Sequence, residues 1–193
     1  MESTLNPHPG AIAAALAVLA VLAPAHAAER TLRLDPAASH VDFTLDATLH
    51  KAEGKIPVRE GEIRFDLETG HASGRIVLDA RGATTDNKGR DEKMHEQVLE
   101  SARFPEIVFV PTEAHGSLDP SGAGSVSLTG TISIHGADHP FTVTAQVKTE
   151  GEKLSAAGSF MIPYVKWGMK DPSVFVLRVA KEVEVHIEAV GSL

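Results

Sequence analysis

The chain has 193 residues, of which 42% are hydrophobic and 23% charged, an ordinary composition for a globular protein. Its formal net charge is −8 and it has no basic cluster, which argues against binding to nucleic acid or to an anionic membrane surface. It contains no cysteine, which excludes disulfides, a thiol nucleophile and cysteine-based zinc sites.

An apolar run, AIAAALAVLAVLAPA, occupies residues 11–25 and ends in an A-x-A pattern at Ala25-His26-Ala27. This pattern predicts a secretory signal peptide over residues 1–27, followed by a mature domain at 28–193. The run is too short to predict a stable membrane span. The preceding MESTLNPHPG has none of the Lys or Arg residues that usually open a signal peptide, and a misplaced start at Met1 would explain this.

From residue 31 onward the apolar residues recur with period two, which indicates strands with one buried face. In SHVDFTLDATLH one face consists of Val41, Phe43, Leu45, Ala47 and Leu49. The segment GEIRFDLETG repeats the pattern with Ile63, Phe65 and Leu67. Similar segments, separated by turn residues, continue to the C-terminus. They predict roughly eight long strands in one all-β domain.

The order of these segments favours an antiparallel sheet, because consecutive strands are joined by short turns. Closing such a sheet into a barrel removes its exposed edges. A two-sheet sandwich satisfies the same periodicity, so the pattern leaves both architectures open.

One helix is predicted, over residues 91–102, where Met94, Val98 and Ala102 recur at a spacing of four. Asp91 suits the positive N-terminal end of a helix. A helix of about three turns is marginal alone. Its apolar stripe must therefore dock on a sheet face or on an open barrel end.

The same segment contains His95-Glu96, the start of a zinc-protease motif, but the position that requires the second histidine is Leu99. We therefore predict no metal site here. Asp42 and Asp46 share a strand face that we expect to be solvated. The chain contains no nucleophile elbow and no phosphate-binding loop, so neither an enzyme activity nor a cofactor is predicted.

The predicted interior is apolar, and an eight-stranded barrel is either filled by side chains or wide enough for one small ligand. Several inward positions carry small residues that either leave room along the axis or mark bulges and tight bends. These residues are Ala47, Gly74, Ala80, Gly130, Ala145, Ala156 and Gly158.

Four segments together resemble the YceI family over residues 31–191. They are SHVDFTLDATLHKAEGK with GEIRFDLETGHASGRIVLDA, then GRDEKMHEQVLESARFPEIVFVP, LTGTISIHGADHPFTV and YVKWGMKDPSVFVLRVAKEVEVHIEAVG. The chain departs from typical members at Lys93-Met94-His95 and in lacking a phenylalanine-rich run after His50.

The resemblance implies a lipocalin-like, eight-stranded antiparallel barrel with one short helix, exported to the periplasm. It also implies an apolar pore that binds a long polyisoprenoid chain, such as an isoprenoid quinone or a polyprenyl lipid. The helix would then close a barrel end, with Asp91 anchoring its start and Arg90 paired to an acid. The expected ligand-binding residues are Phe43, Leu45, Leu49, Ile63, Phe65, Met94, Val98, Leu99, Phe109, Phe160, Trp167 and Met169.

Trp167 and Met169 are the candidates for the mouth of the pore, although Trp167 packed under its own loop is an equal alternative. Two other functions stay open: a ligand-free β-sandwich that acts as a protein-interaction module, and an enzyme on an apolar substrate. The oligomeric state is also open, with a homodimer as one alternative.

Overall fold

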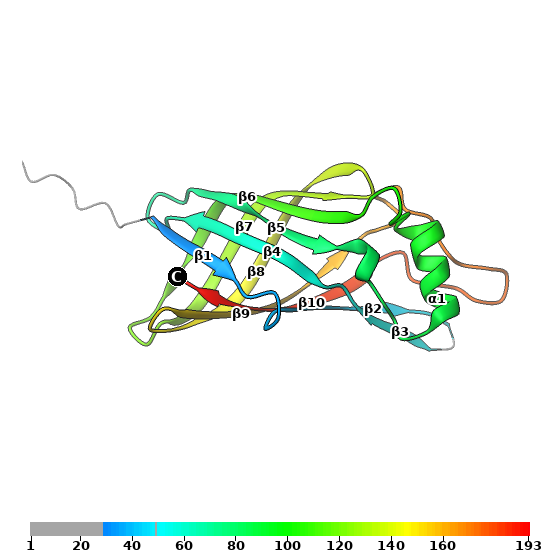
Figure 1. The fold of residues 1–193 in the computed structure, drawn as a ribbon, viewed down its shortest axis with the longest axis horizontal. Coiled ribbons are helices and arrows are strands. Elements are labelled where there is room, and N and C mark those ends of the chain that lie inside the picture. Colours follow the sequence, from blue (N-terminus) through cyan, green and yellow to red (C-terminus); the bar gives the residue numbers. More distant parts are fainter. Residues whose placement is uncertain (1–28, 49) are drawn as a thin grey trace, which may run out of the picture.

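The computed structural model describes residues 29–48 and 50–193 (Figure 1). The strands are β1 (Arg30–Leu34), β2 (His40–Asp46), β3 (Lys51–Lys55), β4 (Val58–Phe65), β5 (Ala72–Asp79), β6 (Glu106–Leu118), β7 (Ala123–Ile134), β8 (Ala137–Glu150), β9 (Lys153–Ile162) and β10 (Val183–Ser192). The helical elements are η1 (Ala80–Gly82), α1 (Lys88–Lys93) and the π-helical turn η2 (Met94–Val98). The predicted signal peptide and Leu49 lie outside the described residues.

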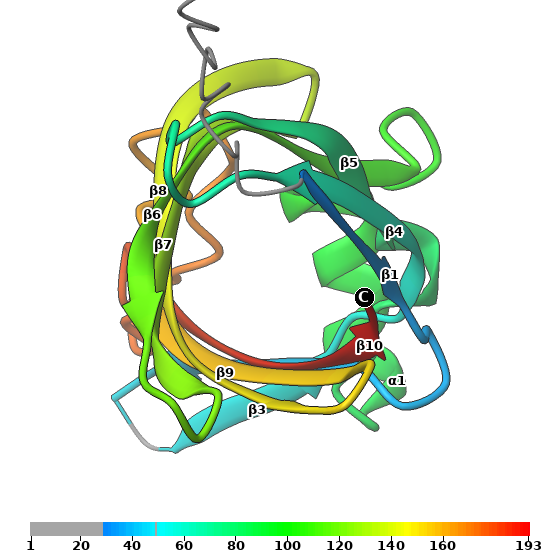
Figure 2. The same ribbon diagram turned by 90° about the vertical axis from the view of Figure 1, so that its left-hand side faces the viewer.

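Eight of these strands form a closed antiparallel barrel, in the order β1-β4-β5-β6-β7-β8-β9-β10, and β1 pairs with β10 to complete the ring. Figure 2 shows this ring along its axis. The predicted eight-stranded barrel is therefore confirmed, and the sandwich alternative is wrong. All strands of the barrel lie within residues 30–192.

The two remaining strands, β2 and β3, extend the barrel wall at one end. Strand β10 is long enough to pair with β1 near Ser192 and with β2 near Glu184. Strand β3 then reaches the segment after β5, where Lys55 and Thr84 exchange backbone hydrogen bonds of 2.8 and 3.0 Å. The hairpin thus continues the wall towards the end where α1 lies (Figure 1).

The helix differs from the prediction at both ends. It begins at Lys88 because the Asn87 side chain accepts a hydrogen bond from the Arg90 N–H, an N-cap that the spacing of apolar residues does not reveal. It ends before residue 102 because Glu100 adopts a left-handed φ of 44°. None of the helices in the described residues is both long and apolar enough to cross a bilayer.

The small inward residues mark close backbone approaches more than open space. A Cβ on Gly74, whose φ is 109°, would lie 2.1 Å from the Glu62 carbonyl oxygen, and one on Gly130 would lie 2.1 Å from that of Val110. Both positions therefore require glycine for strand packing. Of the seven small residues, only Ala47 lines the cavity described below.

Candidate ligand-binding cavity

The barrel contains a cavity of about 650 Å³ in the half that is covered by α1, η2 and the connection between β9 and β10. A volume of this size lies within the range of pockets that hold small molecules. Most of its lining side chains are aliphatic or aromatic and come from β2, β5 to β10, the helix and this connection. Such a surface can exclude water from a hydrocarbon, but it offers few groups for chemistry.

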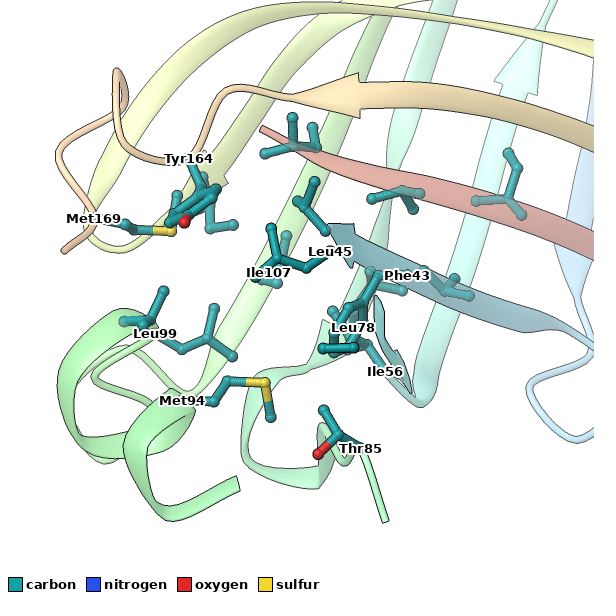
Figure 3. A pocket seen from close by; sticks show the side chains of 18 of the residues that line it. Phe43, Leu45, Ile56, Leu78, Thr85, Met94, Leu99, Ile107, Tyr164 and Met169 are labelled. Atoms are coloured by element: carbon teal, nitrogen blue, oxygen red, sulfur yellow. The ribbon is translucent and has the colours of Figure 1, made fainter. Parts of the chain in front are cut away.

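Eight of the twelve predicted ligand-binding residues line this cavity. They are Phe43, Leu45, Met94, Val98, Leu99, Phe109, Phe160 and Met169. Figure 3 shows Met94 and Leu99 projecting from the helical segment towards Phe43, Leu45 and Ile107 on the wall. The apolar stripe of the helix therefore faces the interior. Whether these side chains contact a ligand stays a prediction.

Ile63 and Phe65 do not line the cavity. Ile63 is 2% exposed and sits opposite Gly74, in the same half as the fully buried Ala114. Side chains along β4 do alternate between the inside and the outside of the barrel, but this alternation does not reveal how far the cavity extends. The cavity ends near Leu34 and Ala189.

Trp167 also lies outside the lining and packs on β8. Its ring stacks on that of His139 from β8, with centroids 4.2 Å apart and planes inclined by 4°. The contact fixes the connection between β9 and β10 to the barrel. Nε2 of His139 is buried and has no hydrogen-bond partner among the described residues.

Sequence reasoning missed much of the cavity wall. The inward residues of β7, β8 and β10 include Ile132, Val143, Val185 and Ile187, and all four line the cavity. The signal was present in the period-two pattern of these segments.

Tyr164 completes the apolar wall beside Met169, and both are buried. Its hydroxyl donates a hydrogen bond of 2.7 Å to the Ala180 carbonyl oxygen, so the polar end of the ring is satisfied. Burial, and secondarily the negative charge of Asp171, raise the pKa of the phenol to about 12. The phenol is therefore uncharged at neutral pH.

Asp91 holds the helix against the turn that precedes it. Its carboxylate accepts hydrogen bonds of 2.8 Å from the Thr84 hydroxyl and the Thr85 N–H. Desolvation opposes its ionisation, but the hydrogen bonds from Thr85 and Thr84 outweigh this and lower its pKa. Asp91 thus anchors the start of the helix as expected.

In the part of the chain that the structure describes, Arg90 is paired with no acid, contrary to the expectation. Its guanidinium donates instead to the hydroxyl and the carbonyl oxygen of Thr85, at 2.8 and 3.1 Å. Arg90 and Asp91 therefore both form hydrogen bonds with the segment Thr84–Thr85.

His95 has a structural role that its sequence motif did not suggest. Nε2 donates to the Ala83 carbonyl oxygen and Nδ1 is hydrogen-bonded to the Ser101 hydroxyl, each at 2.9 Å. Both ring nitrogens are engaged, so His95 joins the helical segment to the loop after β5. Within residues 29–48 and 50–193, no cluster of three or more His, Asp or Glu side chains could hold a metal ion.

Part of the polar lining lies where the helix begins, and another part, His40 and Glu188, comes from β2 and β10. Asn87 and Lys93 are exposed and line the cavity, as does His50 from the loop before β3. These groups form a polar rim around an apolar interior. Such a rim suits a ligand with a hydrocarbon tail and a polar head.

Three solved structures share this architecture. BcnA of Burkholderia cenocepacia is 20% identical, with a TM-score of 0.65 over 81% of this chain and 98% of that one. A polyisoprenoid-binding domain from Saccharophagus degradans, implicated in plant cell wall breakdown, is 14% identical, with a TM-score of 0.66 over 83% and 97%. The Campylobacter jejuni YceI protein is 13% identical, with a TM-score of 0.60 over 76% and 87%.

These low identities establish the fold alone. No curated protein shows a significant sequence match to the chain. The model of the YceI-like domain, in contrast, matches residues 32–191, which include every strand of the barrel except the first two residues of β1 and the last of β10. The chain therefore belongs to the YceI-like domain family.

Proposed function

We propose that this protein is an exported lipid-binding protein whose barrel holds one long polyisoprenoid chain, either an isoprenoid quinone or a polyprenyl lipid. The observation that carries the proposal is the apolar cavity of about 650 Å³ under the helix. The polyisoprenoid-binding domain from Saccharophagus degradans, which shares the fold, supports the choice of ligand class. This function requires no catalytic group.

Solvent exclusion is the proposed source of affinity. Each CH₂ group that moves from water into an apolar site contributes about 0.8 kcal/mol, before the cost of ordering the chain. A branched hydrocarbon offers no polar handle, so the cavity would select by length and width. Asn87 and Lys93 at the rim are the candidates for contact with a polar head group.

Organic extraction of the purified protein, followed by mass spectrometry, tests this function. We expect a co-purifying isoprenoid, or stoichiometric uptake of an added quinone or polyprenyl lipid by the empty protein. Repeated preparations that are empty and take up neither lipid would contradict the proposal.

Export to the periplasm is the second part of the proposal, supported by the apolar run and the A-x-A pattern before Ala28. The intact mass of protein recovered from a periplasmic fraction should correspond to a chain that starts at Ala28. Recovery of the uncleaved chain from the cytoplasm would contradict export. A homodimer also stays a prediction, which the molar mass in solution checks.

A further inference from the structure

The connection between β9 and β10 carries an exposed apolar turn at Val174–Leu177. Val174 and Leu177 exchange backbone hydrogen bonds of 2.9 and 3.2 Å, which places Phe175 and Val176 at the tip. Phe175 is 94% exposed and Val176 is 78% exposed. Because Val174 and Leu177 also line the cavity, this turn stands directly beside the cavity mouth.

The turn is held in place by hydrogen bonds at its base. Thr48 and Arg178 are joined by backbone and hydroxyl hydrogen bonds of 2.9 to 3.1 Å. The Ser173 hydroxyl accepts from the Val179 N–H at 3.0 Å. The two apolar side chains are therefore presented to solvent by an anchored turn.

The position of this turn distinguishes it from other exposed apolar residues. Val110 and Met161 are exposed singly on the barrel wall, as is common in globular proteins. Val174, Phe175 and Val176 are consecutive, and the orange segment that contains them projects past α1 at the end of the molecule opposite the C-terminus (Figure 1). A consecutive exposed group of this kind marks an interaction site.

The charge of the surrounding segment differs from that of the whole chain. Residues 163–182 of this connection contain two acids, Glu182 and Asp171, and the Asp171 carboxylate accepts from the Ser173 N–H at 2.9 Å. They contain four exposed cations: Lys166, Lys170, Arg178 and Lys181. The net charge of −8 argues against binding to an anionic membrane, but it is a sum over the whole chain. Four of the basic residues lie in this one connection.

We infer that the Val174–Leu177 turn docks the cavity mouth on a phospholipid bilayer. Phe175 and Val176 enter the interfacial region, and the neighbouring cations, with Arg178 nearest in the chain, contact lipid phosphates. A protein partner fits less well, because a stable interface buries about 800 Å² per partner and a two-residue tip is far smaller. The inference rests on the proposed function in one respect: docking would let a lipid pass between bilayer and cavity.

Site-specific labelling tests which end of the molecule meets the bilayer. The chain that starts at Ala28 is suitable, because the barrel closes entirely after that residue. Since the chain has no cysteine, V176C accepts a single polarity-sensitive label. The control, E152C, places the same label in the turn beside the C-terminus, where the backbone carbonyl oxygen of residue 152 accepts from the Leu193 N–H.

With vesicles of phosphatidylcholine and phosphatidylglycerol that carry brominated acyl chains, we expect quenching of the label in V176C and none in E152C. An unquenched V176C label, or equal quenching at both positions, would overturn the inference. In the unquenched case a protein partner would become the occupant to consider.

Two further variants separate the turn from general surface hydrophobicity. The double variant F175S/V176S should partition into these vesicles about tenfold less than the unmodified chain, because burial of a Phe side chain is the main gain. M161S, which removes an exposed apolar side chain from β9, should partition normally. Equal partitioning of F175S/V176S and M161S would contradict a role for the turn.

Uptake of a dispersed isoprenoid in the absence of vesicles distinguishes the two proposals. Phe175 and Val176 do not line the cavity, so F175S/V176S should keep normal uptake. Vesicle binding without isoprenoid uptake would reject the proposed function and keep the docking site. Isoprenoid uptake without vesicle binding would reject the docking site and keep the proposed function.

Discussion

Asp91 joins the helix to the barrel through one turn of chain. Its side chain, on α1, bonds to the Thr84–Thr85 segment, and Thr84 in turn pairs with Lys55 of β3. One carboxylate thereby connects the helix to the wall of the cavity. The sequence placed Asp91 at the helix start, but a contact with residues six and seven positions earlier leaves no periodic signal.

Replacement of Asp91 by alanine should reduce the free energy of unfolding by roughly 3 kcal/mol, because it leaves polar groups of Thr84 and Thr85 without their charged acceptor. Chemical denaturation measures this loss. The matched control is Glu92→Ala, which changes an exposed neighbour on the same helix and should cost less than about 0.5 kcal/mol. Equal losses in the two variants would contradict the anchoring role.

The pH dependence of this stabilisation follows from the lowered pKa of Asp91. Its folded-state pKa lies below 3.8, so its contribution is fully present above that value and is lost as the pH falls through the folded pKa. The destabilisation caused by Asp91→Ala should therefore shrink in strongly acidic solution. Denaturation of both proteins at neutral and acidic pH checks the sign.

The pKa of Tyr164 can be measured directly, since it is the only tyrosine in the chain. Its phenolate absorbance should titrate near pH 12 in the folded protein and near pH 10 in denaturant. Because the unfolded chain releases this proton first, stability should fall as the pH rises from about 10 to 12. A folded-state midpoint near 10 would place the ring in water.

At the scale of elements, the helical segment illustrates what periodicity reveals. The spacing of Met94 and Val98 predicted a stripe that faces the barrel, and both side chains line the cavity. The ends were wrong because they depend on local groups, the Asn87 cap and the left-handed Glu100. A cap or a left-handed residue is a single local feature, so it leaves no periodic pattern in the sequence.

The orientation of this segment predicts different effects for two substitutions. Leu99→Glu places a charge against the apolar cavity, which should weaken retention of a bound isoprenoid, because burial of an unpaired charge is costly. Glu96→Ala changes an exposed position and should leave retention unchanged. Quantification of extracted lipid per protein compares the two, and equal retention would count against the proposed ligand position.

At the scale of the whole molecule, the eight-stranded antiparallel barrel could be predicted, whereas the added hairpin of β2 and β3 and the extent of the hollow could not. Period two assigns Ile63 and Phe109 alike to the inside. Only Phe109 meets the cavity, whereas Ile63 is buried but does not line it. Whether an inward position meets the cavity depends on side chains from several strands that meet in space, and period two along one strand does not record these contacts.

The hollow itself can be tested by overfilling it. A larger side chain in a well-packed core costs about 1–3 kcal/mol, whereas an empty cavity accepts it with little strain. Val143→Trp adds an indole from β8 to the cavity, so we expect lost isoprenoid uptake and a stability change below about 1 kcal/mol. Gln146→Trp, at an exposed position of the same strand, should preserve both uptake and stability. A strongly destabilised Val143→Trp would mean that the barrel is packed at this level, whereas a stable variant with undiminished uptake would place the ligand elsewhere.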